Sequence, residues 1–243
     1  MQITSINNPK VKEWAKLKKK KYRDASKQYL VEGDHLVEEA LKAGVVETIL
    51  SLEPMDTAIE HYQVTEEIIK KLSCVDTPQR IIAICQMTQT QDVKIDGKRF
   101  LLLDGLQDPG NIGTLIRTAL AFGYDQVIFS DHSVDLYNDK LMRSSQGACF
   151  HISCIKLPLE HVIDVLHQHD IIVYGTSLEN GKALPTFSVP DKLALVLGNE
   201  GNGMSKKILE STDQNIFIPI QTAESLNVAV AGGICMFYFD GID

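Results

Sequence analysis

The hydrophobic positions give the second half of the chain a regular pattern. From Phe100 onward, short uninterrupted apolar runs recur, and these predict the strands "FLLLDG", "QVIFS", "HISCIKL", "IIVYGT", "LALVLG" and "NIFIPI". Continuous runs of this kind suit strands that are buried on both faces of a parallel sheet. The segments "NIGTLIRTALAFG", "NDKLMRSSQGA" and "PLEHVIDVLHQHD" between them have helical character. The alternation predicts an α/β domain over residues 100–243, with a mostly parallel sheet and helices on both faces.

Residues 1–90 predict a second, smaller α/β domain. Strands are expected at "QYLVEG", "VETILS" and "RIIAICQ". A helix is expected at "DHLVEEALKAG", with Asp34 as N-cap and Gly44 as its stop, and another at "TEEIIKKLSC", with Thr65 as cap. The polar segment that follows has no apolar periodicity, so we assign residues 91–99 as the linker between the domains.

Composition fits a soluble cytoplasmic protein of 243 residues, with 44% hydrophobic and 23% charged residues. No apolar run reaches the roughly 18 residues that span a bilayer, and "MQITSINNPKVKEW" lacks the apolar core of a signal peptide. The five cysteines form no C-x-x-C pair. This usage predicts reduced thiols in the cytoplasm.

Charge is distributed unevenly along the chain. The net charge is −8, but residues 10–23 hold eight Lys or Arg and one Glu, a local charge of +7, so the remainder carries −8 − 7 = −15. A basic block on an acidic protein is typical of a surface that neutralises phosphates, although a solvated helix face explains it as well. The candidate RNA-binding residues of this block are Lys18, Lys19, Lys20, Lys21 and Arg23.

Three polar clusters follow predicted strands of the second domain. The first joins the turn "DPGN" to a helix that carries Asn111 and Arg117. The second, "LGNEGNGMS", is glycine-rich, but its spacing matches neither the dinucleotide fingerprint nor a P-loop. A carboxylate in that loop repels a pyrophosphate and suits an uncharged or cationic ligand. The third cluster interrupts the last apolar segment with "ESLN".

Each cluster taken alone has a structural explanation. Asn111 is explained as a helix cap, Arg117 as a surface cation, and Glu224 or Ser225 as the cap of the final helix. Open α/β sheets place ligands at the carboxyl ends of their strands, so the same side chains could also converge on one ligand.

In this order and at these spacings the clusters resemble the SpoU/TrmH family of RNA ribose methyltransferases, within the SPOUT superfamily. The family pattern N-x-G-x-x-x-R is met by Asn111, Gly113 and Arg117, and G-x-E-x-x-G by Gly198, Glu200 and Gly203. The third pattern, I-P followed by S-L-N-V-A-V-A, is met by Ile218, Pro219, Ser225, Leu226, Asn227, Val228, Ala229, Val230 and Ala231. The resemblance covers residues 100–240, and the segment before it is similar to the RNA-binding domain often attached to these enzymes.

The resemblance implies a SPOUT domain with a trefoil knot, a homodimer, and methyl transfer from S-adenosylmethionine to a ribose 2′-hydroxyl. Ribosomal RNA is favoured over transfer RNA because an added basic domain suits structured ribosomal targets. The cofactor residues that it implies are Thr176, Leu178, Leu197, Gly198, Asn199, Glu200, Gly201, Gly203, Ile218, Pro219, Ile220, Ser225, Leu226 and Asn227.

The catalytic residues implied by the resemblance are Asn111, Arg117, Glu200, Ser225 and Asn227. A guanidinium stays protonated, so Arg117 is expected to position the RNA and to stabilise the developing alkoxide. Arg117 and Arg143 are also expected to contact RNA. No metal is expected, since His167 and His169 do not share a helix face.

Three other functions remain open from the sequence. One is a transfer-RNA methyltransferase, and another is an RNA-binding protein without catalysis. The last is a nucleotide-dependent oxidoreductase, which the glycine spacing and the absence of an acidic ribose-binding residue disfavour.

Overall fold

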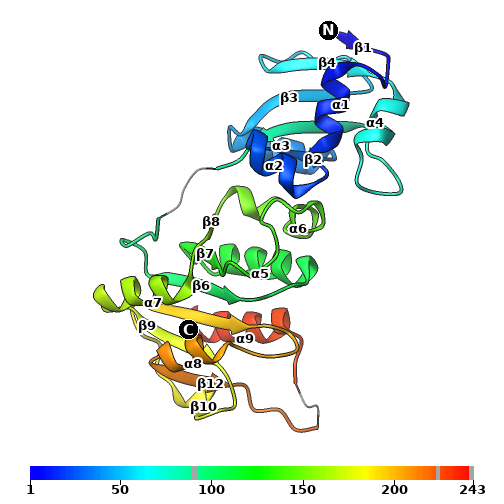
Figure 1. Cartoon of the computed structure of the whole chain (residues 1–243). Helices are drawn as coiled ribbons and strands as arrows, with labels where there is room; N and C mark the ends of the chain where they lie inside the picture. The colour runs from blue at the N-terminus through cyan, green and yellow to red at the C-terminus, as the bar shows by residue number, and fades with distance from the viewer. Residues whose placement is uncertain (89–91, 223–224, 241–243) are drawn as a thin grey trace. The chain divides into compact units, whose positions relative to one another are not determined.

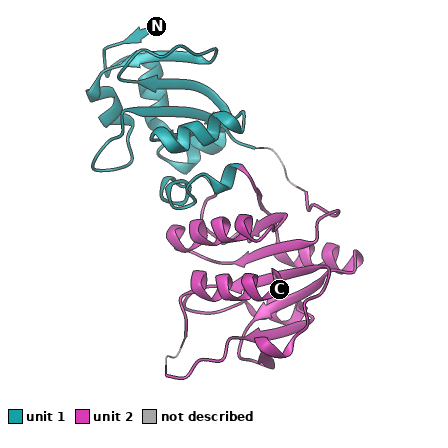
Figure 2. Ribbon diagram, turned by 180° about the vertical axis from the view of Figure 1, so that it is seen from behind, with its two compact units in different colours: residues 1–89, 137–150 teal, residues 90–136, 151–243 magenta. Residues whose placement is uncertain are grey.

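The structure, a computed structural model, describes residues 1–88, 92–222 and 225–240. Its chain divides into two compact units (Figure 2), the first made of Met1–Gln89 and Tyr137–Phe150 and the second of the remainder. The segment Tyr137–Phe150 was expected in the 100–243 domain, yet it belongs to the first unit. Part of the predicted linker, residue 91, lies outside the described residues.

A five-stranded sheet forms the first unit, in the order β1-β4-β3-β5-β2 (Figure 1). Its strands are β1 (Gln2–Ile3), β2 (Gln28–Glu32), β3 (Val46–Ser51), β4 (Glu60–Val64) and β5 (Ile81–Gln86). β1, β4 and β3 pair in parallel, whereas β5 is antiparallel to both β3 and β2. The three strands predicted in this region are confirmed, and β1 and β4 are additional.

Helices cover both faces of this sheet. They are α1 (Pro9–Lys16), α2 (Lys20–Ser26), α3 (Asp34–Lys42), α4 (Glu66–Leu72), α6 (Asp139–Ser144) and the short η1 (Ala148–Phe150). Alternate side chains of β5 point to opposite faces. Ile82 and Ile84 join a cluster with α1 and α4, and Ala83 joins one that contains α3 and Met142 of α6. The segment Tyr137–Phe150 therefore completes the core of the first unit.

Local contacts in the first unit correct two expectations. The N-cap of α3 is Gly33, at φ 99°, and Asp34 is instead the first helical residue, where it forms an ion pair with Arg80. Arg23, expected to contact RNA, is only 7% exposed, and its guanidinium donates to the backbone oxygen of Leu17 at 2.9 Å. That contact fixes the turn between α1 and α2, so Arg23 has a structural role.

The second unit is built on a seven-stranded sheet in the order β10-β12-β9-β11-β6-β7-β8. Its strands are β6 (Arg99–Asp104), β7 (Gln126–Phe129), β8 (Ser153–Lys156), β9 (Ile172–Thr176), β10 (Gly181–Ala183), β11 (Leu193–Gly198) and β12 (Gln214–Phe217). Every described pair in this sheet is parallel. The six predicted strands are present, β10 is additional, and β12 ends before Ile218.

Helices lie on both faces of this sheet as well (Figure 1). They are α5 (Pro109–Ala121), α7 (Leu159–Gln168), η2 (Leu184–Thr186), α8 (Lys206–Ser211) and α9 (Val228–Asp240). Ala194 and Val196 of the fully buried strand β11 join a core with α7 and α8. On the opposite face α5 and α9 pack side by side. Among the described helices, none combines the length and apolar character that crossing a membrane requires.

Close approach of α9 to the sheet depends on Gly232. A methyl group at this position would lie 2.5 Å from Leu115 of α5 and 2.7 Å from Leu197 of β11. Both leucines are fully buried, so a methyl group at this position would have to displace packed side chains. The neighbouring Gly233 has no such restriction, because its nearest atom would be 3.8 Å away, on Thr118.

We expect Gly232→Ala to lower the free energy of unfolding by about 1–2 kcal/mol, since overpacking a core outweighs the gain in helix propensity. Gly233→Ala is the matched control, and it is expected to leave stability unchanged or raised. Denaturant unfolding of both variants measures the difference. Equal stability of the two would show that the contact of α9 with β11 tolerates a methyl group.

Candidate functional site

A large pocket lies where β9, β11 and β12 end and α9 begins, and its volume is about 730 Å³. These are the carboxyl ends of parallel strands, the usual ligand position of open α/β sheets. The expected cofactor residues that line it are Thr176, Leu178, Leu197, Gly198, Asn199, Glu200, Gly201, Gly203, Ile218, Ile220, Ser225, Leu226 and Asn227. Pro219 is exposed and does not line the pocket, and Glu224 lies outside the described residues.

The loop after β11 is held in a fixed shape by its own hydrogen bonds. The backbones of Asn199 and Gly203 exchange two hydrogen bonds of 2.9 Å each. The side-chain oxygen of Asn199 accepts from the backbone N–H groups of Gly201 and Asn202 at 3.0 and 3.1 Å. A side chain at Gly198 would lie 2.2 Å from the backbone nitrogen of Met204. The glycines of this motif therefore permit a close backbone turn beside the pocket.

Hydrogen bonds between side chains join the three sequence motifs directly. The Glu200 carboxylate accepts from the Asn111 side-chain amide at 3.3 Å and from the backbone N–H groups of Asp108 and Gln107 at 3.3 and 3.4 Å. The Asn111 side-chain oxygen accepts from the Asn227 amide at 3.0 Å. Residues more than a hundred positions apart along the chain thus meet beside one pocket.

The caps of α5 and α9 differ from the residues that the sequence suggested for them. α5 begins at Pro109, and its N-cap is Asp108, whose carboxylate accepts from the backbone of Asn111. The Asn111 side chain is thereby left to bridge Glu200 and Asn227. Asn227, rather than Ser225, caps α9, because its side-chain oxygen accepts from the backbone N–H of Ala229 at 2.9 Å.

The charge of Glu200 is stabilised by its surroundings. Burial by itself would raise the pKa of this carboxyl, but hydrogen bonds from its own backbone, from Asn111, and from the backbone of Asp108 and Gln107 outweigh that effect and lower the pKa. Glu200 is therefore ionised near neutral pH and places a negative charge at the pocket, which suits a ligand with a positive centre.

Arg117 stands apart from this cluster. It is exposed on α5, and its side chain has no hydrogen bond or ion pair with any residue that the structure describes. It is also not among the described residues that line the pocket. The structure therefore brings Asn111, Glu200, Ser225 and Asn227 together at one site, while Arg117 remains available for a group from outside the chain.

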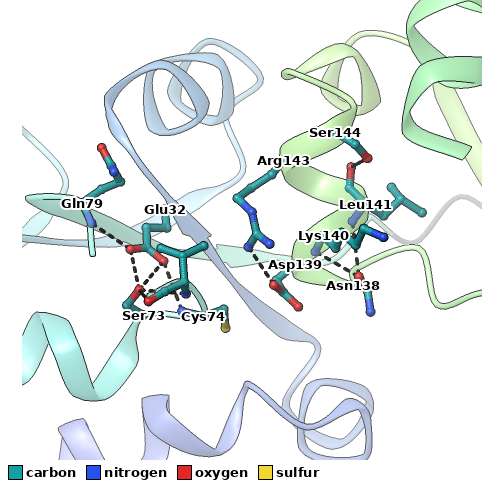
Figure 3. Close-up of polar contacts among 11 residues, drawn as sticks. Glu32, Ser73, Cys74, Gln79, Asn138, Asp139, Lys140, Leu141, Arg143 and Ser144 are labelled. Carbon is teal, nitrogen blue, oxygen red and sulfur yellow. Dashed lines mark hydrogen bonds and ion pairs between the residues drawn. The ribbon is translucent and has the colours of Figure 1, made fainter. Parts of the chain in front are cut away.

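Arg143 lies in the first unit, on α6. Its guanidinium forms an ion pair of 2.7 Å with Asp139, as Figure 3 shows, and its side chain is 35% exposed. Nearby, the Glu32 carboxylate accepts from the Ser73 hydroxyl and from the backbone of Gln79, so it fixes the loop between α4 and β5 (Figure 3).

Within the described ranges no group of His, Cys, Asp and Glu is arranged to hold a metal ion.

Several pocket residues were not anticipated from the sequence. They are Glu179, Met204, Leu209, Ile216, Phe217, Val228, Ala231 and Cys235. Val228, Ala231 and Cys235 share one face of α9, and this helical spacing is the signal that would have identified them. Burial raises the pKa of the Cys235 thiol to about 12, so this cysteine is an unreactive apolar wall.

We expect Glu200→Gln to destabilise the protein, because an amide nitrogen would face N–H donors that now share a carboxylate. Folding lowers the pKa of the Glu200 carboxyl below its ordinary value of 4.5, so this group stabilises the folded protein at any pH above 4.5. The stabilisation is lost as the pH falls through the pKa of the folded state. The difference in melting temperature between wild type and variant should therefore shrink as the pH falls below 4.5. Glu210→Gln, on the surface of α8, is the control and should show no such trend. A difference that does not change with pH would contradict this role.

Solved structures share this architecture over nearly the whole chain. The rRNA methyltransferase from Sinorhizobium meliloti with AdoMet bound superimposes with a TM-score of 0.90 at 27% identity, covering 98% of this chain and 97% of that one. The SpoU methyltransferase AviRb from Streptomyces viridochromogenes, in complex with the cofactor AdoMet, gives 0.87 at 25% identity, covering 96% and 97%. The expected fold class, a mostly parallel α/β methyltransferase domain with a smaller N-terminal domain, is confirmed.

Sequence comparison identifies the same group of proteins. The chain is 41% identical to the 23S rRNA (guanosine(2553)-2′-O)-methyltransferase RlmP of Bacillus subtilis, over 99% of both chains. It is 30% identical to an uncharacterized tRNA/rRNA methyltransferase of Synechocystis, over 97% of this chain and 92% of the relative. Residues 8–83 match the MRM3-like substrate binding domain, and residues 98–237 match the SpoU rRNA Methylase family. The match to the SpoU rRNA Methylase family covers more than half of this chain, so the chain belongs to that family.

Proposed function

We propose that this protein transfers a methyl group from S-adenosylmethionine to the ribose 2′-hydroxyl of a guanosine in 23S ribosomal RNA. One observation carries the proposal: hydrogen bonds join Glu200 to Asn111 and Asn111 to Asn227, one residue from each family motif, beside the pocket of about 730 Å³. The near full-length similarity to RlmP supports the choice of RNA and nucleotide. A ribosomal RNA substrate is consistent with action in the cytoplasm.

The pocket fits the cofactor in size and in chemistry. Its wall combines apolar side chains with a few polar groups, which is typical of small-molecule sites. Leu178 and Ile220 are 76% and 39% exposed at its edge, where a bound adenosine would cover them. The ionised Glu200 complements a positive sulfonium. S-adenosylmethionine supplies a methyl group already activated by that sulfonium, so the protein has to orient the acceptor oxygen.

Arg117 supplies the contact with RNA in this proposal. A ribose hydroxyl is a weak nucleophile, and a guanidinium that stays protonated cannot remove its proton. Bidentate binding of the adjacent phosphate would instead hold the 2′-oxygen in line with the methyl group and favour the developing negative charge. Asn111, Glu200 and Asn227 keep the loops on which this geometry depends in place, and Ser225 lines the same pocket.

In the proposed homodimer, Arg117 of one subunit acts at the cofactor pocket of the other subunit. Val230, Ile234 and Phe237 of α9 are 51%, 39% and 61% exposed and share one helix face. Phe237 contacts Phe122 at the end of α5, with ring centroids 6.0 Å apart. An exposed apolar stripe of this kind is typical of a protein interface, and a second copy is its proposed partner. Arg117, exposed on the helix packed beside α9, then reaches the pocket of the partner subunit.

The basic block of the first unit is the proposed primary contact with the RNA backbone. Lys18, Lys19, Lys20 and Lys21 are all exposed, and they lie in or next to the turn between α1 and α2. Together with the family match of residues 8–83, this supports binding of RNA by that unit. Its affinity should fall steeply with salt, because binding releases counterions. The role of Arg143 in RNA binding remains part of this proposal.

The function is tested by incubating the protein with radiolabelled S-adenosylmethionine and purified 23S, 16S and transfer RNA from a strain in which the gene is deleted. We expect label in 23S RNA and a 2′-O-methylguanosine at a single mapped position. Label in transfer RNA alone, or in none of the three, would overturn the proposal.

We expect Arg117→Ala to reduce the rate of methyl transfer by at least about a hundredfold, comparable to the loss of an electrostatic catalytic group. Binding of S-adenosylmethionine, measured by calorimetry, should change little, since the proposed contact of Arg117 is with an RNA phosphate and not with the cofactor. Lys206→Ala, which removes an exposed cation from α8, is the control and should retain activity. Wild-type turnover by the Arg117 variant would exclude the assigned role.

We expect Phe237→Asp to raise the dissociation constant of the dimer by about 30-fold or more, the size of a typical hot-spot loss. Sedimentation at a series of protein concentrations measures it, and methyl transfer should fall with the fraction of dimer. Val189→Asp, a charge at another exposed valine outside α5 and α9, serves as the control. A Phe237 variant that sediments as the wild type would show that this face is not the interface.

A further inference from the structure

The first unit contains a cleft of about 680 Å³ that the methyl-transfer site does not use. β2 and β3 are both antiparallel to β5, and β4 is parallel to β3, so the amino ends of β2, β3 and β4 meet at one edge of the sheet. α1 and α2 cover that edge. The lining residues on which the argument rests are Lys10, Glu13, Trp14, Lys16, Tyr22 and Glu47.

Aromatic rings and lysines lie together on the helical side of this cleft. Tyr22 is half-buried, and the ammonium groups of Lys16 and Lys21 lie 5.8 and 5.0 Å from its ring centroid. Trp14 lies beneath, 8% exposed, with its ring centroid 5.7 Å from that of Tyr62. An aromatic face with cations around it is the arrangement on which nucleobases stack.

The cleft contains three carboxylates, Glu47 and Glu60 on strands and Glu13 on α1, and two of them are neutralised. Glu60 pairs with Lys10 at 3.1 Å, and Glu13 pairs with Lys16 at 2.6 Å. Glu47 differs, because within the part of the chain that the structure describes it accepts one hydrogen bond, from the side chain of Gln28 at 2.5 Å, and has no ion pair. Glu47 therefore retains the capacity to accept further N–H donors.

We propose that this cleft receives the base of one unpaired nucleotide of the RNA substrate, stacked on Tyr22 with its amino group directed to Glu47. The inference rests on the proposed function and adds the contact that the first unit would make. The Glu47 carboxylate, which has no ion pair among the described residues, disfavours a phosphate at this position, whereas the lysines at the turn between α1 and α2 attract phosphates, so the base enters and the backbone stays outside. In a duplex the amino groups are already paired, and the bases are stacked on one another.

Trp14 is the single tryptophan of the chain, so its fluorescence reports directly on the cleft. We would titrate the full-length protein with the RNA pentamers UUUUU, UUAUU, UUCUU and UUGUU. We expect quenching, with tighter binding of the three pentamers whose central base has an amino group, since uracil has none. A duplex of the same length should change the fluorescence little.

Two variants separate base recognition from general attraction to RNA. Tyr22→Ala should weaken binding about 5- to 100-fold, the range measured for loss of one stacked base, and Tyr22→Phe should restore it. Glu47→Gln removes a negative charge, so general electrostatics predicts tighter binding, whereas our inference predicts weaker binding and loss of the preference over UUUUU. Glu53→Gln, an exposed glutamate outside the cleft, is the matched control and should bind as tightly as wild type or slightly tighter.

The inference is overturned if Glu47→Gln binds RNA as tightly as Glu53→Gln, if Tyr22→Ala binds like wild type, or if duplex RNA quenches Trp14 equally. Equal binding of free AMP and of UUAUU would also overturn it, because the site would then take mononucleotides. Methylation of 23S RNA by the same preparations tests the proposed function separately. Methyl transfer without a Trp14 response would reject the cleft alone, and a Trp14 response without methyl transfer would reject the proposed function alone.

Discussion

The arrangement of this site depends on the hydrogen bonds that run from Glu200 through Asn111 to Asn227. Each of the three residues follows a different strand of the parallel sheet, and the loops that carry them are otherwise separate. Two partners orient the Asn111 side chain: its N–H donates to the Glu200 carboxylate, and its oxygen accepts from the Asn227 amide. Because every side chain in this series of hydrogen bonds has a partner, the three side chains are oriented before any ligand binds, which reduces the entropic cost of binding.

This constraint reaches into the hydrophobic core. Asn111 and Asn227 stand at the starts of α5 and α9, and further along the same two helices Phe122 contacts Phe237. The two helices therefore run side by side in the same direction. Gly232 lets α9 lie against β11, where Leu197 and Gly198 lead into the Glu200 loop. The hydrogen bond between Asn227 and Asn111 therefore depends on the packing of α9 against the core, since a shift of α9 would move Asn227 away from Asn111.

The first unit has a different physical character. Its sheet is mixed, its helices include a lysine-rich pair, and part of its core comes from Tyr137–Phe150, a segment that follows β7 of the second unit along the chain. Met142 is buried in that core, and Tyr137 lies against Tyr29 with ring centroids 4.6 Å apart. The chain therefore passes from the second unit into the first and returns. The unit proposed to bind RNA and the unit proposed to transfer the methyl group are therefore joined by more than one polypeptide connection.

The sequence by itself determined the elements whose signal is local. Continuous apolar runs identified the strands of the second unit, because burial on both faces demands them, and three motifs identified the family. Tertiary structure decided which partners each residue meets. Arg23 is buried and donates to the backbone of Leu17. Asp108 caps α5, so the Asn111 side chain is able to bind Glu200. Met204 and Cys235 line the pocket. These outcomes depend on contacts between residues far apart along the chain, whereas periodicity describes only a residue and its near neighbours. For the same reason "NDKLMRSSQGA" predicted a helix correctly but not the core in which that helix is buried.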